Sequence, residues 1–524
     1  MEQPAPPETA AKRAQWGKVI DHTRCIGCHA CTTACKSENL VPLGVTRTYV
    51  KHVDVGTFPQ ARRAHQVTRC NQCAHAPCVA ACPTSAMFKR PDGIVDFDKR
   101  ICIGCKACMA ACPYDAIFIN PEDHSAEKCN FCAHRIDSGL EPACVVVCPT
   151  EAILVGDMND PQSKVARIAA REPVQVRRPE KETLPKLFYK GAHQATLDPL
   201  AARRPSGDLY MWSEQPVGEG IIPSGNPDYS NTSAAALLSY DVAHAIPWDW
   251  RVGLYTWTKS IAAGAYLVAV LLWLYADVYG RMTLAADVLI NSASPLWLWV
   301  VPVLSGFFLA ATGALLVWDL EHPARFYMIF TRPQWRSWLV KGAFIIAGYS
   351  LVLALHFVAV LLDKRAWTLP LVFAGLPLAA LTAVYTAYLF AQAKARDLWQ
   401  NPLLPPHLLV QALVAGSAAL LPFAAWLETR LVAPLAWTLS VSSVLHLLLV
   451  WGETTLTHPT AHARLAAWEL VRNRYAPYFW AGLALTAAGA FAPWLELAAV
   501  PLALIGLLLY EHAYVQAGQS VPLA

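Results

Sequence analysis

Length, composition and charge indicate two unlike halves rather than one uniform domain. The chain has 524 residues, of which 55% are hydrophobic and 15% are charged, and its formal net charge is only +4. The composition of the whole chain is the average of a polar part and a strongly apolar part. It therefore matches neither a typical soluble domain nor a chain that lies entirely in the membrane. So weak a basicity gives no argument for binding nucleic acid.

The chain opens with a predicted N-terminal tail, residues 1–16. The tail contains no apolar segment of signal-peptide length, and its Lys12-Arg13 pair is not a twin-arginine motif. We therefore expect a reducing compartment, which argues against disulfide bonds.

Cysteines dominate the next segment, residues 17–160. All 16 of them form four quartets: Cys25, Cys28, Cys31 and Cys35; Cys70, Cys73, Cys78 and Cys82; Cys102, Cys105, Cys108 and Cys112; and Cys129, Cys132, Cys144 and Cys148. Three closely spaced cysteines can hold three corners of an iron–sulfur cube, and the fourth points toward a neighbouring cluster. The first and third quartets share the motif CIGCxAC, which predicts a duplicated bacterial-ferredoxin-like domain of α+β fold.

Structural zinc is the alternative use of paired CxxC elements. Three of the four quartets, however, end in a cysteine followed by proline after a three-residue gap. That feature is typical of ferredoxins, and a zinc site has no need to repeat it.

The quartets in this order, from CIGCHACTTACKSEN to CNFC and CVVVCP, resemble the four-cluster iron–sulfur subunits of molybdopterin oxidoreductases, such as polysulfide and dimethyl sulfoxide reductases. The resemblance implies four 4Fe-4S clusters and a separate molybdenum or tungsten pterin catalytic subunit as partner. It also implies four ligand sets: Cys25, Cys28, Cys31 and Cys148; Cys35, Cys129, Cys132 and Cys144; Cys70, Cys73, Cys78 and Cys112; and Cys82, Cys102, Cys105 and Cys108.

Residues 161–250 are rich in proline and charge and show no sustained periodicity. We expect them to form an extended connector that lies over the ferredoxin-like domain.

Residues 251–518 contain apolar runs long enough to cross a membrane as helices. They predict an all-α polytopic bundle of about eight transmembrane helices, at 254–276, 295–318, 337–361, 366–391, 406–426, 431–451, 476–494 and 496–516. In this arrangement the loops on the ferredoxin side carry nine Lys or Arg residues and the opposite loops carry four. The excess favours the cytoplasmic (inner) membrane with the ferredoxin-like domain on the cytoplasmic side.

Three motifs in this half, TKSIAAGAYL, DLEHPARFYMIF and NPLLPPHLLVQALVAGSAAL, resemble the NrfD / polysulfide-reductase membrane-anchor family. The resemblance implies quinone exchange without haem. Because ionisable groups at membrane depth are costly, those near the ferredoxin side are candidates for the quinone site: Lys259, Asp319, Glu321, Arg325 and Lys341. His407, His446 and His512 also lie toward that side, so their depth leaves a haem open.

Together these features predict an electron-transfer and membrane-anchor subunit for anaerobic respiration. It would pass electrons between the quinone pool and the pterin subunit, and substrate catalysis would occur on that other chain. The alternative is a module of a larger energy-coupling respiratory complex that oxidises quinol and translocates protons. A membrane-tethered redox sensor is disfavoured, because nothing in the chain resembles an output domain.

Overall fold

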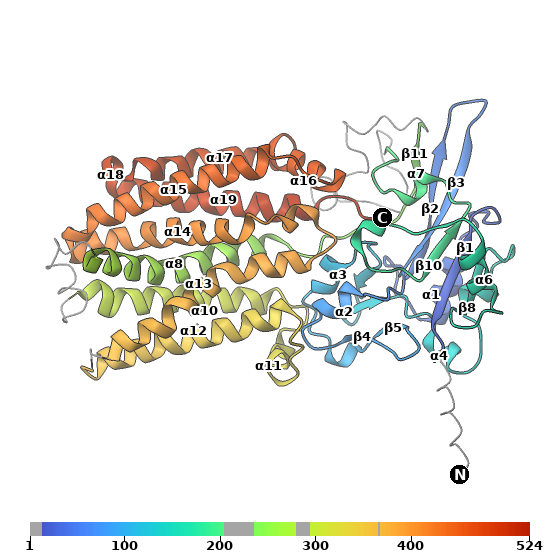
Figure 1. The fold of residues 1–524 in the computed structure, drawn as a ribbon, viewed down its shortest axis with the longest axis horizontal. Helices are drawn as coiled ribbons and strands as arrows, with labels where there is room; N and C mark the ends of the chain where they lie inside the picture. The colour runs from blue at the N-terminus through green and yellow to red at the C-terminus, as the bar shows by residue number, and fades with distance from the viewer. Residues whose placement is uncertain (1–12, 204–234, 279–293, 365–366) are drawn as a thin grey trace, which may run out of the picture.

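The computed structural model describes residues 13–203, 235–278, 294–364 and 367–524. The molecule is elongated, with a bundle of long helices at one end and a domain of small sheets and short helices at the other (Figure 1). This arrangement confirms the predicted fold class, an α+β ferredoxin-like domain followed by a helical bundle.

Two sheets and two hairpins build the ferredoxin-like domain. The first sheet has the strand order β8-β1-β10-β9, formed by Ile153–Asp157, Trp16–Asp21, Leu187–Lys190 and Val174–Gln175. The second has the order β11-β2-β3, formed by Leu237–Tyr240, Thr48–Val55 and Arg62–Arg69. The hairpins pair β4 (Met87–Lys89) with β5 (Val95–Phe97), and β6 (Ile117–Ile119) with β7 (Ala126–Lys128).

The cysteines lie on short helices and in the loops just before or after them, and the internal repeat is visible in the backbone. The helices are α1 (Ala30–Glu38), α2 (Pro77–Ala81), α3 (Ala107–Ala111), α4 (Ala133–Ile136) and α5 (Ala143–Val146). Gly27 and Gly104 have φ of 70° and 69°, and His29 and Lys106 both have φ of 59°. Both turns place left-handed residues at matching positions between cysteines, so the duplicated CIGCxAC motif wraps its thiols in the same conformation twice.

The region expected to be an extended connector has more regular structure than its composition suggests. After α6 (Lys164–Arg171), strand β10 pairs in parallel with β1, and β11 pairs with β2. Strand β9 and helix α7 (Gln194–Leu197) lie between them. Pairing with strands more than 160 residues away explains why no local periodicity revealed these elements.

Long helices running nearly parallel form the bundle (Figure 1). They are α8 (Trp250–Val278), η4 (Leu296–Val300, a π-helical turn) continuing into α10 (Val301–Trp318), α12 (Trp338–Leu361), α13 (Thr368–Gln392), α14 (Leu404–Leu427), α15 (Val432–Thr455), α17 (Ala476–Ala488) and α19 (Ala499–Gln519). Within the described ranges, six segments are long and apolar enough to cross a membrane. Helix α8, which carries Lys259, is not among the six, and one segment of the six comprises both α17 and α19.

Residues 476–519 form two antiparallel helices and not one long helix. The sites of a Cβ on Gly482 and on Gly506 would lie 2.8 Å from the backbone nitrogen of Tyr510 and 2.5 Å from that of Thr486, respectively. The chain reverses through η9 (Gly489–Phe491), α18 (Ala492–Leu495) and η10 (Glu496–Ala498), and Glu496 has φ of 48°. The expected break between the last two crossings is therefore present.

Buried cations hold the two halves together at the C-terminal segment. Arg396, just after α13, donates to the carbonyls of Gln519 and Val521 at 2.7 and 3.2 Å. From the ferredoxin-like side, Arg177 donates to the carbonyl of Leu523 at 2.8 Å. The ferredoxin-side helix ends are thus fixed relative to the cysteine domain.

Candidate functional site

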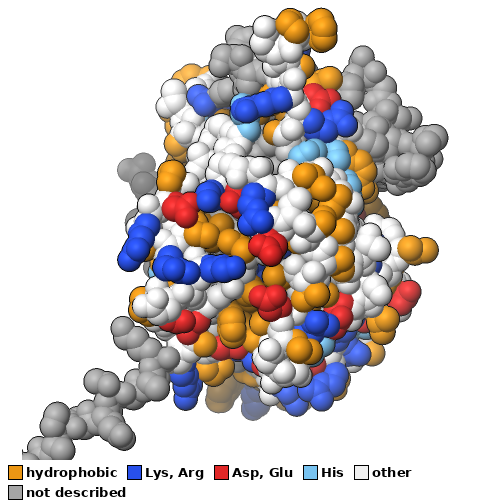
Figure 2. Space-filling view, turned by 90° about the vertical axis from the view of Figure 1, so that its right-hand side faces the viewer, with side chains coloured by type: hydrophobic (Ala, Val, Ile, Leu, Met, Phe, Trp, Pro, Cys, Tyr) orange, Lys and Arg blue, Asp and Glu red, His pale blue; other side chains and the backbone are white. Residues whose placement is uncertain are grey.

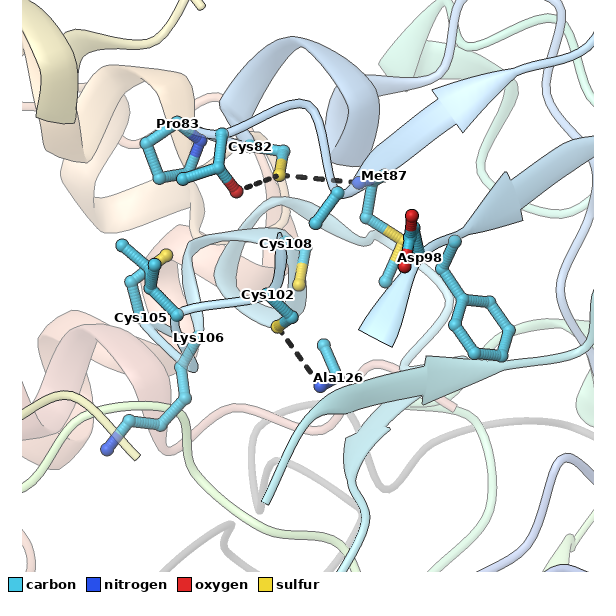
Figure 3. Close-up of a pocket in the computed structure, with 13 residues that line it drawn as sticks. Cys82, Pro83, Met87, Asp98, Cys102, Cys105, Lys106, Cys108 and Ala126 are labelled. Atoms are coloured by element: carbon cyan, nitrogen blue, oxygen red, sulfur yellow. Dashed lines mark hydrogen bonds between the residues drawn. The ribbon is translucent and has the colours of Figure 1, made fainter. Parts of the chain in front are cut away.

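Four cysteine side chains surround a small cavity on the bundle-facing side of the ferredoxin-like domain. They are Cys82, which follows α2, Cys102 and Cys105 in the loop before α3, and Cys108 on α3 (Figure 3). The backbone N–H groups of Met87 and Ala126 donate to the sulfurs of Cys82 and Cys102 at 3.3 and 3.4 Å. Amide donors aimed at sulfur suit thiolates that carry negative charge.

A second cavity has the same construction and lies beside the start of α1. It is lined by Cys25, Cys28, Cys31 and Cys148, and the backbone N–H of Ala152 donates to the Cys148 sulfur at 3.2 Å. Both cavities combine three cysteines of one quartet with one of another. This is the donor set that a 4Fe-4S cube requires.

The remaining eight cysteines are buried. Burial raises the pKa of the Cys35 and Cys73 thiols to about 12 and that of Cys112 to about 11. Such thiols keep their protons near neutral pH unless a metal ion replaces them, so they are suited to holding metal and not to acting as free thiolates.

Arg69 lies among these cysteines, and none of the described carboxylates pairs with it. Its side chain is fully buried, and Nη1 donates to the Cys144 sulfur at 3.0 Å. Its Nε and Nη2 have no hydrogen-bond partner among the described residues. Burial is the largest influence and would raise the pKa of Cys144, but the charges of Arg69 and Lys18 and the hydrogen bonds to the sulfur together outweigh it and lower the pKa.

A larger cavity, of about 230 Å³, lies between the bundle helices where they meet the ferredoxin-like domain. Most of its lining is apolar or aromatic and comes from α8 and the residues just before it, α10 and the segment after it, α12 and α13, including Trp248, Tyr255, Phe326, Phe330, Ile346 and Tyr385. Two of its lining residues differ from this apolar wall. Asp319 ends α10, and Cys105 also lines the cysteine cavity beside α3.

Asp319 is the predicted quinone-site residue that lines this cavity. Its Oδ1 lies 3.3 Å from Nζ of Lys106 and 3.7 Å from the guanidinium of Arg251. Burial raises the pKa of the Asp319 carboxyl to about 6, although both cations act in the opposite direction. A carboxyl with this pKa exchanges a proton readily near neutral pH.

Glu321 and Arg325 lie outside the lining and connect the two halves. Glu321 also pairs with Lys106, at 3.3 Å, and its backbone N–H donates to the carbonyl of Gly104. Arg325 donates to the carbonyls of Lys99 and Cys102 at 2.9 and 3.0 Å. These contacts fix the cysteine loop against the end of α10.

Lys259 and Lys341 lie apart from Asp319. The Lys259 side chain is fully buried and donates to the carbonyl of Ala383 and to Oγ1 of Thr386, at 2.9 and 2.8 Å. Its Nζ lies 5.3 Å from the centre of the Tyr385 ring, which lines the cavity. Lys341 stacks over Trp338 at 4.4 Å.

Sequence reasoning missed several residues of this region. Lys106 is visible in the motif CIGCKAC, but its partner Asp319 is 213 residues away. Glu453 is buried two residues before the ferredoxin-side end of α15, and Glu511 is buried eight residues before that of α19. The rule that singled out Lys259, an ionisable group inside an apolar span, would have found Glu511 in the expected span 496–516, whereas Glu453 lies two residues beyond the expected span 431–451.

Comparison with known protein families identifies both halves. A family model described as "Polysulphide reductase, NrfD" matches residues 240–503, and two models described as "4Fe-4S dicluster domain" match residues 17–83 and 64–158. With the apolar helices, the NrfD match makes this a multi-pass membrane protein.

Curated relatives match the N-terminal half. A tetrathionate reductase subunit from Salmonella typhimurium is 41% identical over 210 residues, which cover 38% of this chain and 81% of the relative. A polysulfide reductase polypeptide from Wolinella succinogenes is 42% identical over 177 residues, covering 33% of this chain and 93% of the relative. The arsenate respiratory reductase iron-sulfur subunit of a Shewanella species is 37% identical over 222 residues, covering 33% and 94%.

Proposed function

This protein belongs to the NrfD polysulphide reductase family and carries 4Fe-4S dicluster domains in the same polypeptide, and on that premise we propose that it carries electrons between membrane quinone and a separate catalytic subunit that holds a molybdenum or tungsten pterin. The similar subunits of tetrathionate, polysulfide and arsenate reductases support this role. Joining the two functions in one polypeptide keeps the cluster domain and the membrane anchor at a ratio of one to one.

Four 4Fe-4S clusters are held by the four cysteine sets, each with three ligands from one quartet and one from another. The two cysteine-lined cavities support two of these sets, Cys82 with Cys102, Cys105 and Cys108, and Cys148 with Cys25, Cys28 and Cys31. Arg69 beside Cys144, and Asn39, which lies 3.6 and 3.7 Å from the sulfurs of Cys35 and Cys132, support a third set. When bound, each cluster accepts and releases one electron.

The observation that carries the quinone assignment is the position of Cys105. This cysteine lines both the cysteine cavity and the apolar cavity between the helices. A cluster ligand and a membrane-facing cavity therefore meet at one residue. A cavity of about 150 Å³ holds benzene, so one of about 230 Å³ has room for a substituted six-membered ring.

The cavity wall supplies the chemistry that a quinone head group needs. Aromatic and aliphatic side chains contact the ring, while Asp319 offers a carboxyl that gives or takes a proton at one quinone oxygen. Lys106 holds that carboxyl in place from the cluster side. Lys259, Glu321, Arg325 and Lys341 act around the cavity and not in its lining.

The same proposal leaves the membrane half without haem. His407 Nε2 and His446 Nδ1 lie 2.8 Å apart, which is hydrogen-bond distance and leaves no room for an iron between them. His512 packs on the ring of Tyr478. Quinone and the clusters are then the electron carriers, and the excess of Lys and Arg on the ferredoxin-side loops favours the cytoplasmic side of the inner membrane for the cluster domain.

The catalytic partner is expected to dock at the end of the molecule that faces away from the bundle, where the cavity of the first quartet lies. Figure 2 shows hydrophobic and charged side chains interspersed on this end. Among exposed apolar residues, Ile26 and Val146 lie within two residues of Cys28 and Cys148, and they are 59% and 63% exposed. Electrons entering near Cys105 would leave here.

Two glycines on α10 give a matched test of the quinone site. Gly313 lines the cavity, whereas Gly306, two turns earlier on the same helix, does not, and neither has a neighbour within 4 Å of its Cβ position. Reduced decylubiquinol is added to the purified anaerobic protein, and cluster reduction is followed by electron paramagnetic resonance. Gly313→Leu should abolish reduction by the quinol but leave reduction by dithionite intact, while Gly306→Leu should behave as wild type. If decylubiquinol reduces the clusters of both variants to the same extent, the assignment of this cavity as the quinone site is contradicted.

A further inference from the structure

Buried ionisable side chains occupy α14 and α15, away from the cavity that the quinone assignment uses. His407 on α14 joins His446 on α15 at 2.8 Å through Nε2, and its Nδ1 lies 3.0 Å from Oε1 of Glu453 on α15. Both rings are fully buried and the Glu453 side chain is 3% exposed. Helix α14 packs against α15, so this group lies inside the bundle.

Helix α19 extends this group toward α8 through two consecutive residues. The hydroxyl of Tyr510 donates to Oε2 of Glu453 at 3.1 Å. The next residue, Glu511, accepts a hydrogen bond from the hydroxyl of Thr256 on α8 at 2.9 Å. Helix α19 packs against both α14 and α8, so it bridges the two regions.

One turn of α8 then separates Glu511 from the quinone cavity. Lys259 lies three residues after Thr256 on α8, so the two side chains lie on the same face of that helix. The ammonium of Lys259 lies beside the Tyr385 ring, and Tyr385 and Tyr255 both line the cavity. The polar side chains therefore run from Glu453 across α19 to the wall of the cavity.

These polar side chains, from Glu453 to Lys259, form a row whose Glu453 end lies at the ferredoxin side of the bundle. Glu453 lies two residues before the end of α15 and His407 three residues after the start of α14. Both helix ends lie beside the ferredoxin-like domain (Figure 1). Lys259 and Glu511 lie about two helical turns deeper, at ~1.5 Å per residue.

Packing alone gives no reason for so many ionisable groups in one place. A buried carboxylate or imidazole costs free energy unless it is paired, and a bundle of this kind is normally filled with apolar side chains. His446 Nε2 and Glu511 Oε1 are buried without a hydrogen-bond partner in the described part of the chain. Both atoms can take up or release a proton.

We propose that Glu453, His407, His446 and Tyr510 form a buried proton-binding site, near the ferredoxin-side ends of α14 and α15, that exchanges protons with the quinone cavity through Glu511 and Lys259. This proposal rests on the proposed quinone function. Oxidation of one quinol sends two electrons, one at a time, to the clusters and releases two protons. The row accepts protons from the cavity and passes them to the ferredoxin side, and quinone reduction reverses both flows.

The test compares two buried carboxylates. Glu453→Gln removes the carboxyl at the centre of the row. Glu469→Gln is the matched control, because Glu469 on α16 (Ala461–Val471) is 1% exposed and accepts a hydrogen bond from Asn473, outside the row. Full-length protein in lipid nanodiscs is mixed with reduced decylubiquinol, and the single-turnover rate of cluster reduction is measured in H2O and in D2O.

Glu453→Gln should lower the rate by at least about 10-fold and increase the ratio of the H2O rate to the D2O rate. The affinity for decylubiquinone and the reduction of the clusters by dithionite should stay at wild-type values, and Glu469→Gln should match wild type in every measurement. If Glu453→Gln does not fold, Tyr510→Phe breaks the link to Glu453 while keeping the ring, and the same slowing is expected.

If Glu453→Gln or Tyr510→Phe folds and keeps the wild-type rate and the wild-type ratio of the H2O rate to the D2O rate, the proposal is overturned. The quinone function would still stand. Slowing with an unchanged isotope ratio would indicate a structural role and would overturn the proposal as well. If decylubiquinol does not reduce the clusters of the wild-type protein, the quinone function itself fails, and this site loses its role with it.

Discussion

Nζ of Lys106 lies 3.3 Å from Oδ1 of Asp319, so the loop that carries Cys105 is joined by an ion pair to the cavity at the end of α10. Both side chains are about nine-tenths buried. Breaking one partner of a buried pair leaves the other charge uncompensated. This pair therefore fixes the distance between a cluster ligand and the residue proposed to exchange protons with quinone.

Asp319→Asn should lower quinol-driven cluster reduction by at least about 10-fold, because an amide cannot give or take the proton at the quinone oxygen. Cluster content, measured as iron per protein, should be unchanged. Glu321→Gln is the control, since Glu321 contacts the same Lys106 from outside the cavity lining. A similar loss in both variants would assign the pair to domain docking instead of proton exchange.

Arg69→Met should lower the midpoint potential of the cluster expected on Cys35, Cys129, Cys132 and Cys144. The reduced cluster carries one more negative charge, which the buried guanidinium stabilises from 3.0 Å at Cys144. The expected shift is on the order of 50 mV, because a tenfold change in a one-electron equilibrium is about 59 mV. Redox titration followed by electron paramagnetic resonance measures it, and the exposed Arg171→Met should leave all potentials unchanged.

His244 predicts a loss of stability at high pH. Its Nδ1 lies 2.5 Å from Asp115 and its Nε2 lies 3.1 Å from Asp241, which ties the segment before α8 to the ferredoxin-like domain. Burial alone would lower the pKa of His244, but the two carboxylates outweigh it and raise the pKa to about 10. In the unfolded chain the pKa is about 6.5.

Because the folded state binds this proton more tightly, the contribution of His244 is complete below about pH 6.5 and disappears as the pH rises through about 10. The difference in thermal midpoint between wild type and His244→Gln should therefore be largest near pH 6.5 and shrink by pH 10. His75→Gln, at an exposed histidine, serves as control. A difference that stays constant with pH would contradict the ion pair.

The membrane helices could be predicted closely because an apolar run of about 20 residues is a local property. The expected span 337–361 differs by one residue from α12, Trp338–Leu361. The strands contributed by residues 174–190 could not be predicted, since β10 takes its place only through pairing with β1. Their local sequence, rich in proline and charge, resembles a linker.

Only some parts of the candidate site could likewise be predicted from the sequence. Cysteine spacing indicated the quartets because ligand geometry is local, whereas the cavity depends on how several helices face one another. Asp319 was found by its charge. Tyr255 and Tyr385 were not, because aromatic residues are common in such helices and only the packing shows which of them line a cavity. Lys259, chosen by the same charge rule, lies behind Tyr385 and not in the lining.

The crossing of α8 and α14 depends on two glycines, and this predicts a large effect from a single methyl group. A Cβ on Gly264 would lie 1.7 Å from the carbonyl oxygen of Ala412, and one on Gly416 would lie 2.0 Å from the carbonyl carbon of Gly264. Backbones this close exclude any side chain, so Gly264→Ala must separate the helices. Overpacking of this kind costs about 1–3 kcal/mol or more.

Gly264→Ala should therefore lower the thermal midpoint of the detergent-purified protein and, because α8 carries Tyr255 in the cavity wall, weaken the binding of decylubiquinone. Gly348→Ala on α12 is the matched control, since its Cβ would meet Leu378 at 3.5 Å, an ordinary contact. A wild-type midpoint for Gly264→Ala would mean that the backbones of α8 and α14 leave room for a methyl group between them. A wild-type thermal midpoint together with weaker decylubiquinone binding would mean that the substitution changes the shape of the cavity without destabilising the bundle.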